Sequence, residues 1–137
     1  IYQDLAAALP RIRRRLDRLN PAPTRDIPIL IGGGGERKTL RLVAEHAHIW
    51  HSFSDSSTYP RKAEILAQHC AAVGRDPAGI ERSAGVTGGT EEALLAEADR
   101  LADLGVSLFT VGVNGPDYDL SQAAALCRWR DRRTERR

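Results

Sequence analysis

The sequence predicts an α/β fold in which about four parallel strands alternate with helices. Short apolar runs rich in β-branched residues recur along the chain, and stretches with the apolar spacing of a helix lie between them. The resulting strand–helix units span roughly 25 to 35 residues, long enough for helical crossovers between parallel strands. Two architectures contain such units: a doubly wound open sheet and half of an eight-stranded (β/α) barrel. We expect a half barrel, because each predicted helix has one apolar face of similar width, as helices in an outer ring do.

The first part of the chain contains a long helix followed by two strands. Residues 2–19 repeat apolar side chains at helical spacing, at Leu5, Leu9, Ile12, Leu16 and Leu19. A Pro-rich connector, 20–26, leads to a continuous apolar run at 27–31, which is typical of a strand buried on both faces. Helical spacing returns from Glu36 onward, and a second short strand is expected at 48–53.

The second part continues the alternation. Ser57 or Thr58 is expected to cap a helix. A third strand, weaker in composition, is predicted at 80–86, and Thr90 is expected to cap the helix after it. Residues 106–113 are the clearest strand, and a last helix follows. The whole chain, 1–137, is therefore interpreted as one half-barrel unit.

Composition and charge exclude several classes of protein. The chain of 137 residues is 42% hydrophobic and 28% charged, with a formal net charge of only +2. Positive charge is local, at 11–15 and 128–137, where solvated helix faces explain it. No motif that reads nucleic acid accompanies these residues, so no nucleic-acid partner is expected. No apolar stretch approaches the roughly 18 residues of a membrane span, and no signal peptide opens the chain.

The two cysteines and the N-terminus bear on the origin of the chain. Cys70 and Cys127 lie far apart within helical patterns, so we expect reduced core thiols in a cytoplasmic protein. The sequence begins with Ile1 and contains no methionine. Because a translated chain starts with Met, we expect this chain to be a piece of a longer one-domain protein.

Four short polar or glycine-rich stretches follow the predicted strands, at 32–39, 51–57, 87–90 and 114–119. In parallel α/β folds, ligands bind beyond the carboxyl ends of the strands. The connectors at the opposite end look like plain turns. We therefore expect the functional end of the fold at these four stretches.

The stretch "GGGGERKT" at 32–39 is the strongest candidate for a ligand site. Free N–H groups at a helix start bind anions, and Gly34 and Gly35 allow the backbone to close around phosphate oxygens. Arg37 or Lys38 would add positive charge and the Thr39 hydroxyl a hydrogen bond. Neither the P-loop nor the dinucleotide-binding fingerprint is present. The stretch predicts a phosphate site, and a purely structural turn is the alternative.

The histidines do not form a metal site by their spacing. His46 and His48 lie around the end of a predicted helix, where a structural role is usual, and His51 lies at the carboxyl end of a strand, where it can face a ligand. No carboxylate or cysteine completes a ligand set, so no metal is expected. Trp50 is expected to pack in the core.

Two segments resemble the luciferase-like monooxygenase superfamily, and in particular its deazaflavin (coenzyme F-420)-dependent oxidoreductases. They are "PILIGGGGERKTLRLVAEHAHIWH" and "ILAQHCAAVGRDPAGIERS", within a match over about residues 9 to 83. The family pattern is P-I-x-I-G-G-x-G, then T-L-R-L-V-A-x-x-A-D-x-W and L-x-x-H-C-x-x-x-G-R-D-P. His48 stands where the family usually has Asp. Beyond residue 84 the resemblance is weaker but keeps the order of strands and helices.

The resemblance implies a (β/α)8 barrel of which this chain is the C-terminal half. It implies that the backbone at Gly34, Gly35 and Glu36, with the Thr39 hydroxyl, helps to hold the cofactor phosphate. Coenzyme F-420 is the expected cofactor and FMN the alternative, and a small molecule is the expected substrate. The family places the ring cradle and most acid–base residues on the other half, so no catalytic residue carries over. The expected cofactor-binding residues are Gly33, Gly34, Gly35, Glu36, Arg37 and Thr39.

Three functional readings are therefore compared. The first is the cofactor phosphate-binding half of a deazaflavin- or FMN-dependent oxidoreductase. The second is a non-catalytic half barrel that acts by pairing with another subunit, and the third is an unrelated phosphate-binding module with an open sheet. In the first two readings, the chain is expected to form a homo-oligomer or to pair with a missing N-terminal half, because exposed strand edges recruit other chains.

Overall fold

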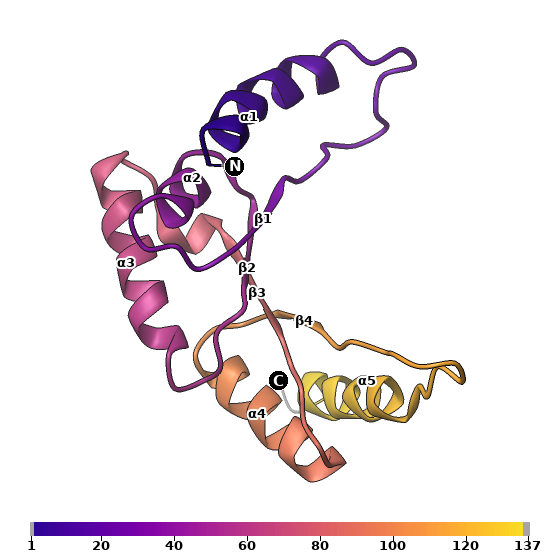
Figure 1. The fold of residues 1–137 in the computed structure, drawn as a ribbon. Helices are drawn as coiled ribbons and strands as arrows, with labels where there is room; N and C mark the ends of the chain where they lie inside the picture. The colour runs from indigo at the N-terminus through magenta and orange to yellow at the C-terminus, as the bar shows by residue number, and fades with distance from the viewer. Residues whose placement is uncertain (1, 136–137) are drawn as a thin grey trace.

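A computed structural model describes residues 2–135, which form a parallel sheet surrounded on one side by helices (Figure 1). One helix comes first, and strands then alternate with helices. The helices are α1 (Tyr2–Leu16), α2 (Thr39–His46), α3 (Tyr59–Ala72), α4 (Glu91–Asp103) and α5 (Ser121–Thr134), with a short 3-10 helix, η1 (Pro77–Gly79). The strands are β1 (Leu30–Gly32), β2 (Ile49–Ser52), β3 (Glu81–Gly85) and β4 (Leu108–Thr110). The predicted α/β class is confirmed.

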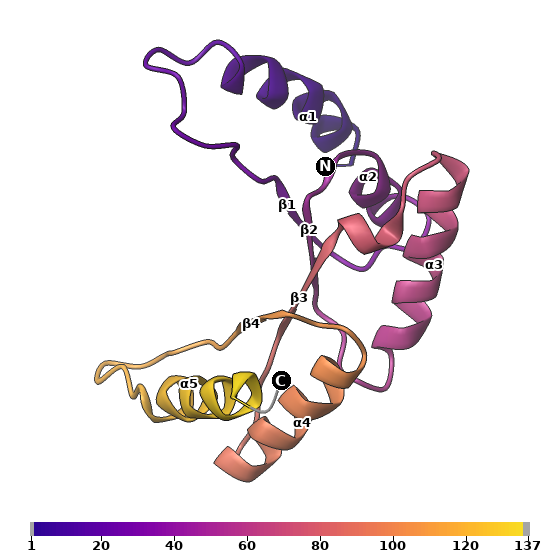
Figure 2. The same cartoon turned by 180° about the vertical axis from the view of Figure 1, so that it is seen from behind.

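The order of the strands identifies the architecture. The four described strands form one sheet in the order β1-β2-β3-β4, and each neighbouring pair is parallel. A doubly wound sheet reverses its strand order at a switch point and has helices on both faces. Here the order is sequential, and the helices form an arc around one side of the sheet (Figures 1 and 2). The fold is therefore half of a (β/α)8 barrel, as predicted.

The two faces of the sheet have different surroundings. Side chains on the outer face, such as Ile31, Trp50 and Ala84, are buried beneath the helices. On the opposite face, Leu30 is 50% exposed and Leu108 is 37% exposed. We call this the inner face; its residues are Leu30, Gly32, Ile49, His51, Glu81, Ser83, Gly85, Leu108 and Thr110, of which Ser83 is buried. In a closed barrel these positions would face the barrel interior.

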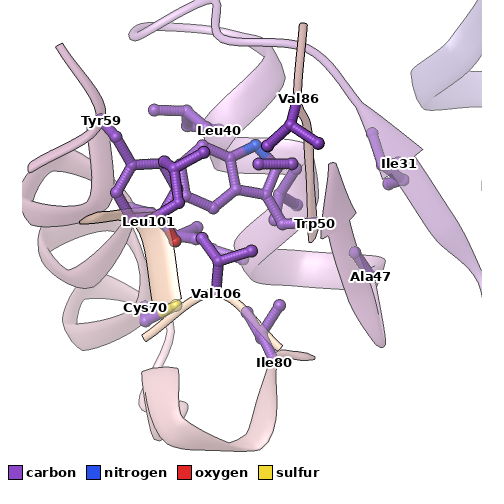
Figure 3. Close-up of a cluster of buried hydrophobic side chains, with 14 of the residues drawn as sticks. Ile31, Leu40, Ala47, Trp50, Tyr59, Cys70, Ile80, Val86, Leu101 and Val106 are labelled. Carbon is purple, nitrogen blue, oxygen red and sulfur yellow. The ribbon is translucent and has the colours of Figure 1, made fainter. Parts of the chain in front are cut away.

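The main core lies between the outer face and helices α2, α3 and α4 (Figure 3). Trp50 and Tyr59 are fully buried and stack with ring centroids 5.5 Å apart. Leu40 and Leu101 pack in the same cluster. Each such apolar side chain contributes roughly 1.5–3 kcal/mol when buried. The expected core position of Trp50 is confirmed, and because Trp50 ends up next to the glycine stretch, the core also supports that stretch.

Strand β1 is shorter and more exposed than the sequence predicts. The apolar run at 27–31 indicates a strand buried on both faces, yet β1 covers Leu30–Gly32 and half of the Leu30 surface is exposed. Pro28 has no N–H to donate to a ladder, which limits pairing on that side. The inner face lacks a second layer among residues 2–135, so the expectation of burial on both faces was wrong for this strand.

The two cysteines differ in their surroundings. Cys70 is buried in the core, as predicted, and burial raises the pKa of its thiol. Cys127 is exposed, so the expectation of a core thiol was wrong there. The reason is its place on α5, which buries Leu126 and Trp129 on its other side. Within residues 2–135, no helix has both the length and the apolar character needed to cross a membrane.

Candidate phosphate-binding site

The glycine stretch forms a loop between β1 and α2, at the carboxyl end of the sheet. Gly33 has a φ of 138°, which side-chain-bearing residues rarely adopt. Its N–H donates to the carbonyl of His51 at 3.0 Å, and its carbonyl accepts from Trp50 Nε1 at 2.8 Å. The neighbouring strand and the buried indole therefore hold the start of the loop in place.

Thr39 lies close against the backbone of this loop. A Cβ on Gly33 would stand 2.8 Å from Thr39 Cγ2, and a Cβ on Gly35 would stand 2.8 Å from Thr39 Oγ1. Both distances are shorter than Cβ contacts in real proteins, so a side chain at either glycine would force the Thr39 side chain to shift. The predicted grouping of Gly33, Gly35 and Thr39 is thus present in the structure.

The helix after the loop begins three residues later than expected. Residues 36–38 form a turn, and α2 begins at Thr39 rather than near Glu36. The Leu40 N–H donates to the Gly35 carbonyl at 3.0 Å, which closes the turn. Within the part of the chain that the structure describes, the N–H groups of Gly34, Gly35 and Arg37 donate to no protein acceptor. These donors are available to an anion.

The positive charge beside the loop comes from helix α3. Lys62 Nζ lies 2.8 Å from Glu36 Oε1, and Arg61 Nε lies 3.1 Å from the same oxygen. A Cβ on Gly34 would stand 3.8 Å from Lys62 Cε, so the lysine stem runs along the loop. Hydrogen bonds first from Lys62 and then from Arg61 hold the pKa of the Glu36 carboxyl below its ordinary value.

Lys62 lies beside the candidate site, and sequence reasoning missed it. The sequence favours Arg37 or Lys38 because they adjoin the glycines, but the Arg37 side chain is exposed. The available signal was "YPRK" at 59–62, in which two cations enter the first turn of the helix after the second predicted strand. Parallel strands bring successive helix starts to one end of the fold, so these cations arrive beside the first loop.

Three histidines act as structural hydrogen-bonding groups. His48 Nδ1 accepts from the Ile29 N–H at 2.9 Å, which gives a role to the side chain standing where the family usually has Asp. His69 Nε2 lies 2.7 Å from the Glu36 carbonyl and so ties α3 to the turn. His51 Nδ1 pairs with Ser83 Oγ at 2.8 Å on the inner face. Among residues 2–135, no group of three His, Cys, Asp or Glu residues is arranged to hold a metal ion.

The second polar stretch is ordered by two carboxylates. The prediction that Ser57 or Thr58 caps α3 was wrong, because Asp55 holds the turn before this helix. Asp55 Oδ1 accepts hydrogen bonds from the N–H and hydroxyl groups of both residues at 2.7–3.1 Å. These bonds, led by the Ser57 hydroxyl, lower the pKa of Asp55. Glu97 accepts from the Ser56 N–H at 2.6 Å and from its hydroxyl at 2.8 Å. Glu97 thus connects helix α4 to Ser56 in the loop before α3.

The third and fourth stretches have mainly structural contacts. Thr90 Oγ1 accepts from the Ala93 N–H at 3.2 Å, so its predicted capping role is confirmed. A Cβ on Gly88 would stand 2.7 Å from the Leu94 backbone nitrogen, which explains that glycine by close packing. In the fourth stretch, Asp119 accepts from the N–H and hydroxyl of Ser121 before α5. The contacts of these two stretches therefore fix the starts of helices α4 and α5.

The sequential parallel βα units define a half-barrel α/β protein, with the glycine loop following β1. In barrels of this kind, ligands bind at the carboxyl ends of the strands. The family model described as luciferase-like monooxygenase matches residues 9–128. The chain therefore belongs to the luciferase-like monooxygenase family, which confirms the resemblance at the level of the superfamily and extends it beyond residue 84. Membership supports oxidoreductase chemistry of the flavin or deazaflavin kind. A comparison with curated proteins returned no match.

Proposed function

We propose that this chain is the cofactor phosphate-binding half of a deazaflavin- or flavin-dependent oxidoreductase. The observation that carries the proposal is the loop at 33–39, where unpaired backbone N–H groups, the Thr39 hydroxyl and the Lys62 ammonium surround the same turn. Phosphate oxygens accept hydrogen bonds and carry negative charge, so they match this set of donors.

The fit of the loop to a phosphate rests on its glycines. Side chains at Gly34 and Gly35 would project toward Lys62 and Thr39, respectively, and would fill the space in which the donors are exposed. Coenzyme F-420 is our proposed cofactor and FMN is the alternative; both present a phosphate group. When bound, either one supplies hydride transfer. The chain's own residues hold the phosphate.

A second part of the proposal concerns the partner of the half barrel. The inner face exposes Leu30 and Leu108, and strands β1 and β4 each pair on one side only within residues 2–135. We propose that a second copy of the chain, or an N-terminal half, covers this face. A small-molecule substrate would then bind between the two halves, where the remaining ring-holding and acid–base groups are expected.

The phosphate proposal is tested by substituting Gly35 with valine. The new side chain collides with Thr39 Oγ1 and blocks the donors, so binding of FMN and of coenzyme F-420 should fall at least about tenfold, the equivalent of 1.4 kcal/mol. Fluorescence titration measures the affinities. The matched control is Gly79→Val, because a Cβ on Gly79 meets no atom within 4 Å and the residue lies before β3 at the opposite end of the sheet.

The outcomes of this experiment separate binding from folding. The Gly35→Val chain should keep the circular dichroism spectrum of the parent chain, because the substitution lies in a loop. Unchanged cofactor affinity in a folded Gly35→Val variant would sink the phosphate proposal. An equal loss in the Gly79→Val control would show that a general disturbance, and not the loop, was measured.

A further inference from the structure

The candidate phosphate site contains a negative charge of its own. Glu36 directly follows the four glycines, and its side chain is 30% exposed. A carboxylate repels a phosphate group, and water and salt screen this repulsion less at a half-buried position than at the surface. Glu36 therefore affects which anions the loop binds.

Helix α3 holds the Glu36 carboxylate with two cations. Arg61 Nε lies 3.1 Å from Oε1, and Arg61 Nη2 donates to Oε2 at 3.1 Å, so the guanidinium contacts both oxygens. Lys62 Nζ donates to Oε1 at 2.8 Å. The hydrogen bonds from Lys62 and then from Arg61 keep the pKa of Glu36 below its ordinary value, so this carboxyl group is ionised at neutral pH.

The backbone of Glu36 is held by the same helix. His69, further along α3, has its Nε2 atom 2.7 Å from the Glu36 carbonyl oxygen. The turn is also closed by the Leu40 N–H, which donates to the Gly35 carbonyl at 3.0 Å. Because both the main chain and the side chain of Glu36 are bonded to α3, the carboxylate is kept beside Lys62.

The ion pairs at the loop leave a single positive charge. Arg61 and Lys62 carry one positive charge each, and Glu36, which pairs with both within the described residues, carries one negative charge. Arg37 and Lys38 are exposed, so water and salt screen their charges. One net positive charge balances one negative charge on a ligand and no more.

Phosphate esters differ in the charge that they bring to such a site. A phosphodiester carries one negative charge at neutral pH, whereas a phosphomonoester carries close to two. The phosphate of coenzyme F-420 is a diester, and the phosphate of FMN is a monoester. The second charge of a monoester finds no further unpaired cation on α3 and is repelled by the Glu36 carboxylate.

We propose that Glu36 is a specificity-determining residue, which biases the loop toward a singly charged phosphodiester and against a doubly charged phosphomonoester. The open N–H groups of the loop bind oxygens that both esters possess, whereas Glu36 acts on the charge by which they differ. The inference rests on the proposed function, and it favours a deazaflavin over a flavin as the cofactor. It is independent of what covers the inner face, because Glu36 and its partners lie in the loop and on α3.

The test compares two ligands that share one ring system and differ in the charge of the phosphate. They are FMN, a monoester, and the phosphate methyl ester of FMN, a diester. Both are titrated by fluorescence into the full chain at about pH 8, where the monoester carries close to two charges. We expect Glu36→Gln to raise the affinity for FMN about three- to tenfold more than the affinity for the methyl ester.

Three further variants establish that charge is the cause. Glu36→Asp keeps the carboxylate, so the ratio of the two affinities should stay within about twofold of the parent value. Glu64→Gln removes an exposed carboxylate from the same helix and should also leave the ratio within about twofold. Lys62→Gln removes a positive charge and should move the ratio in the opposite direction, toward the methyl ester.

The ratio separates a charge effect from a scaffold effect. If Glu36 only holds α3 against the turn, Glu36→Gln weakens both ligands equally and the ratio keeps its parent value. That result, or a shift of the ratio toward the methyl ester, would overturn the inference. Should Glu36→Gln fail to fold by circular dichroism, Lys62→Gln decides the matter, since an unchanged ratio in that variant contradicts the charge argument equally.

Gly35→Val distinguishes a failure of this inference from a failure of the proposed function. If this substitution leaves the affinities for both esters unchanged, the loop does not bind the phosphate, and the proposed function and the inference fail together. If it weakens both esters while Glu36→Gln leaves their ratio unchanged, the inference alone fails and the proposed function stands.

Discussion

At the scale of single residues, we propose that Lys62 strengthens anion binding at the glycine loop. Its ammonium lies 2.8 Å from Glu36, beside the open N–H groups, whereas the Arg37 side chain is exposed. We expect Lys62→Gln to weaken FMN or phosphate binding about tenfold, because a charge-assisted contact contributes roughly 1.5–3 kcal/mol. Arg37→Gln is the matched control and should change affinity less than about threefold. Calorimetric titration measures the affinity of both variants. Equal losses would show that the anion is attracted by the overall positive charge near the loop and not by Lys62 in particular.

Glu97 makes the stability of the chain depend on pH at the acidic end. Burial raises the pKa of Glu97, but hydrogen bonds from Ser56 and from Arg100 outweigh burial, so the pKa lies below its ordinary value of 4.5. A lowered folded-state pKa stabilises the fold above pH 4.5, and this contribution disappears as the pH falls through the folded value. Urea unfolding from pH 7 to 3 should therefore show a smaller acid loss in Glu97→Gln than in the parent chain.

The control for this pH profile is Glu92→Gln, on the exposed side of the same helix. It should leave the acid limb of the profile close to that of the parent chain. If the free energy of unfolding of Glu97→Gln falls as steeply at acidic pH as that of the parent chain, the Ser56 contact contributes nothing to folding.

At the scale of an element, the start of helix α4 depends on one cap. Thr90 Oγ1 accepts from the Ala93 N–H, and Glu91 and Glu92 occupy the first turn, where the helix dipole favours acids. Thr90→Ala should lower the free energy of unfolding by about 1 kcal/mol. Thr87→Ala, in the same exposed stretch but outside the cap, should change it by less than about 0.5 kcal/mol. Chemical denaturation measures the difference, and equal values would rule out a capping contribution.

At the scale of the whole molecule, the inner face determines how the chain associates. Leu30, Phe53 and Leu108 expose apolar surface there, and the edge strands β1 and β4 have unpaired sides within the described residues. Light scattering on residues 1–137 should show a dimer, a larger species or aggregation. Leu108→Glu should shift the distribution toward smaller species. Leu120→Glu is the control, since Leu120 is exposed outside the sheet; a cooperative, monomeric parent chain would contradict the prediction.

The fold could largely be predicted from the sequence because its signals are local. Helical spacing, apolar runs and turn residues act over a few positions, and together they predicted the order of strands and helices and the glycine loop. Two of the predictions that failed concern surroundings: Cys127 and Leu30 belong to apolar patterns, but no described element covers them fully. Two others concern helix starts, because α2 begins at Thr39 and the turn before α3 is held by Asp55. The exposure of Cys127 and Leu30 depends on where the arc of helices and the sheet end in space.

The sequence by itself therefore determined the alternation of elements, the parallel sheet and the position of the glycine loop after the first strand. The tertiary structure decided which side chains surround that loop. Lys62, Trp50 and Ser83 are separated in the sequence from the groups they serve, and they meet them because parallel crossovers bring successive strands side by side in register. No local pattern records such contacts. They arise when the strands pair and the helices pack, which brings the charges of helix α3 beside the loop and His51 beside Ser83.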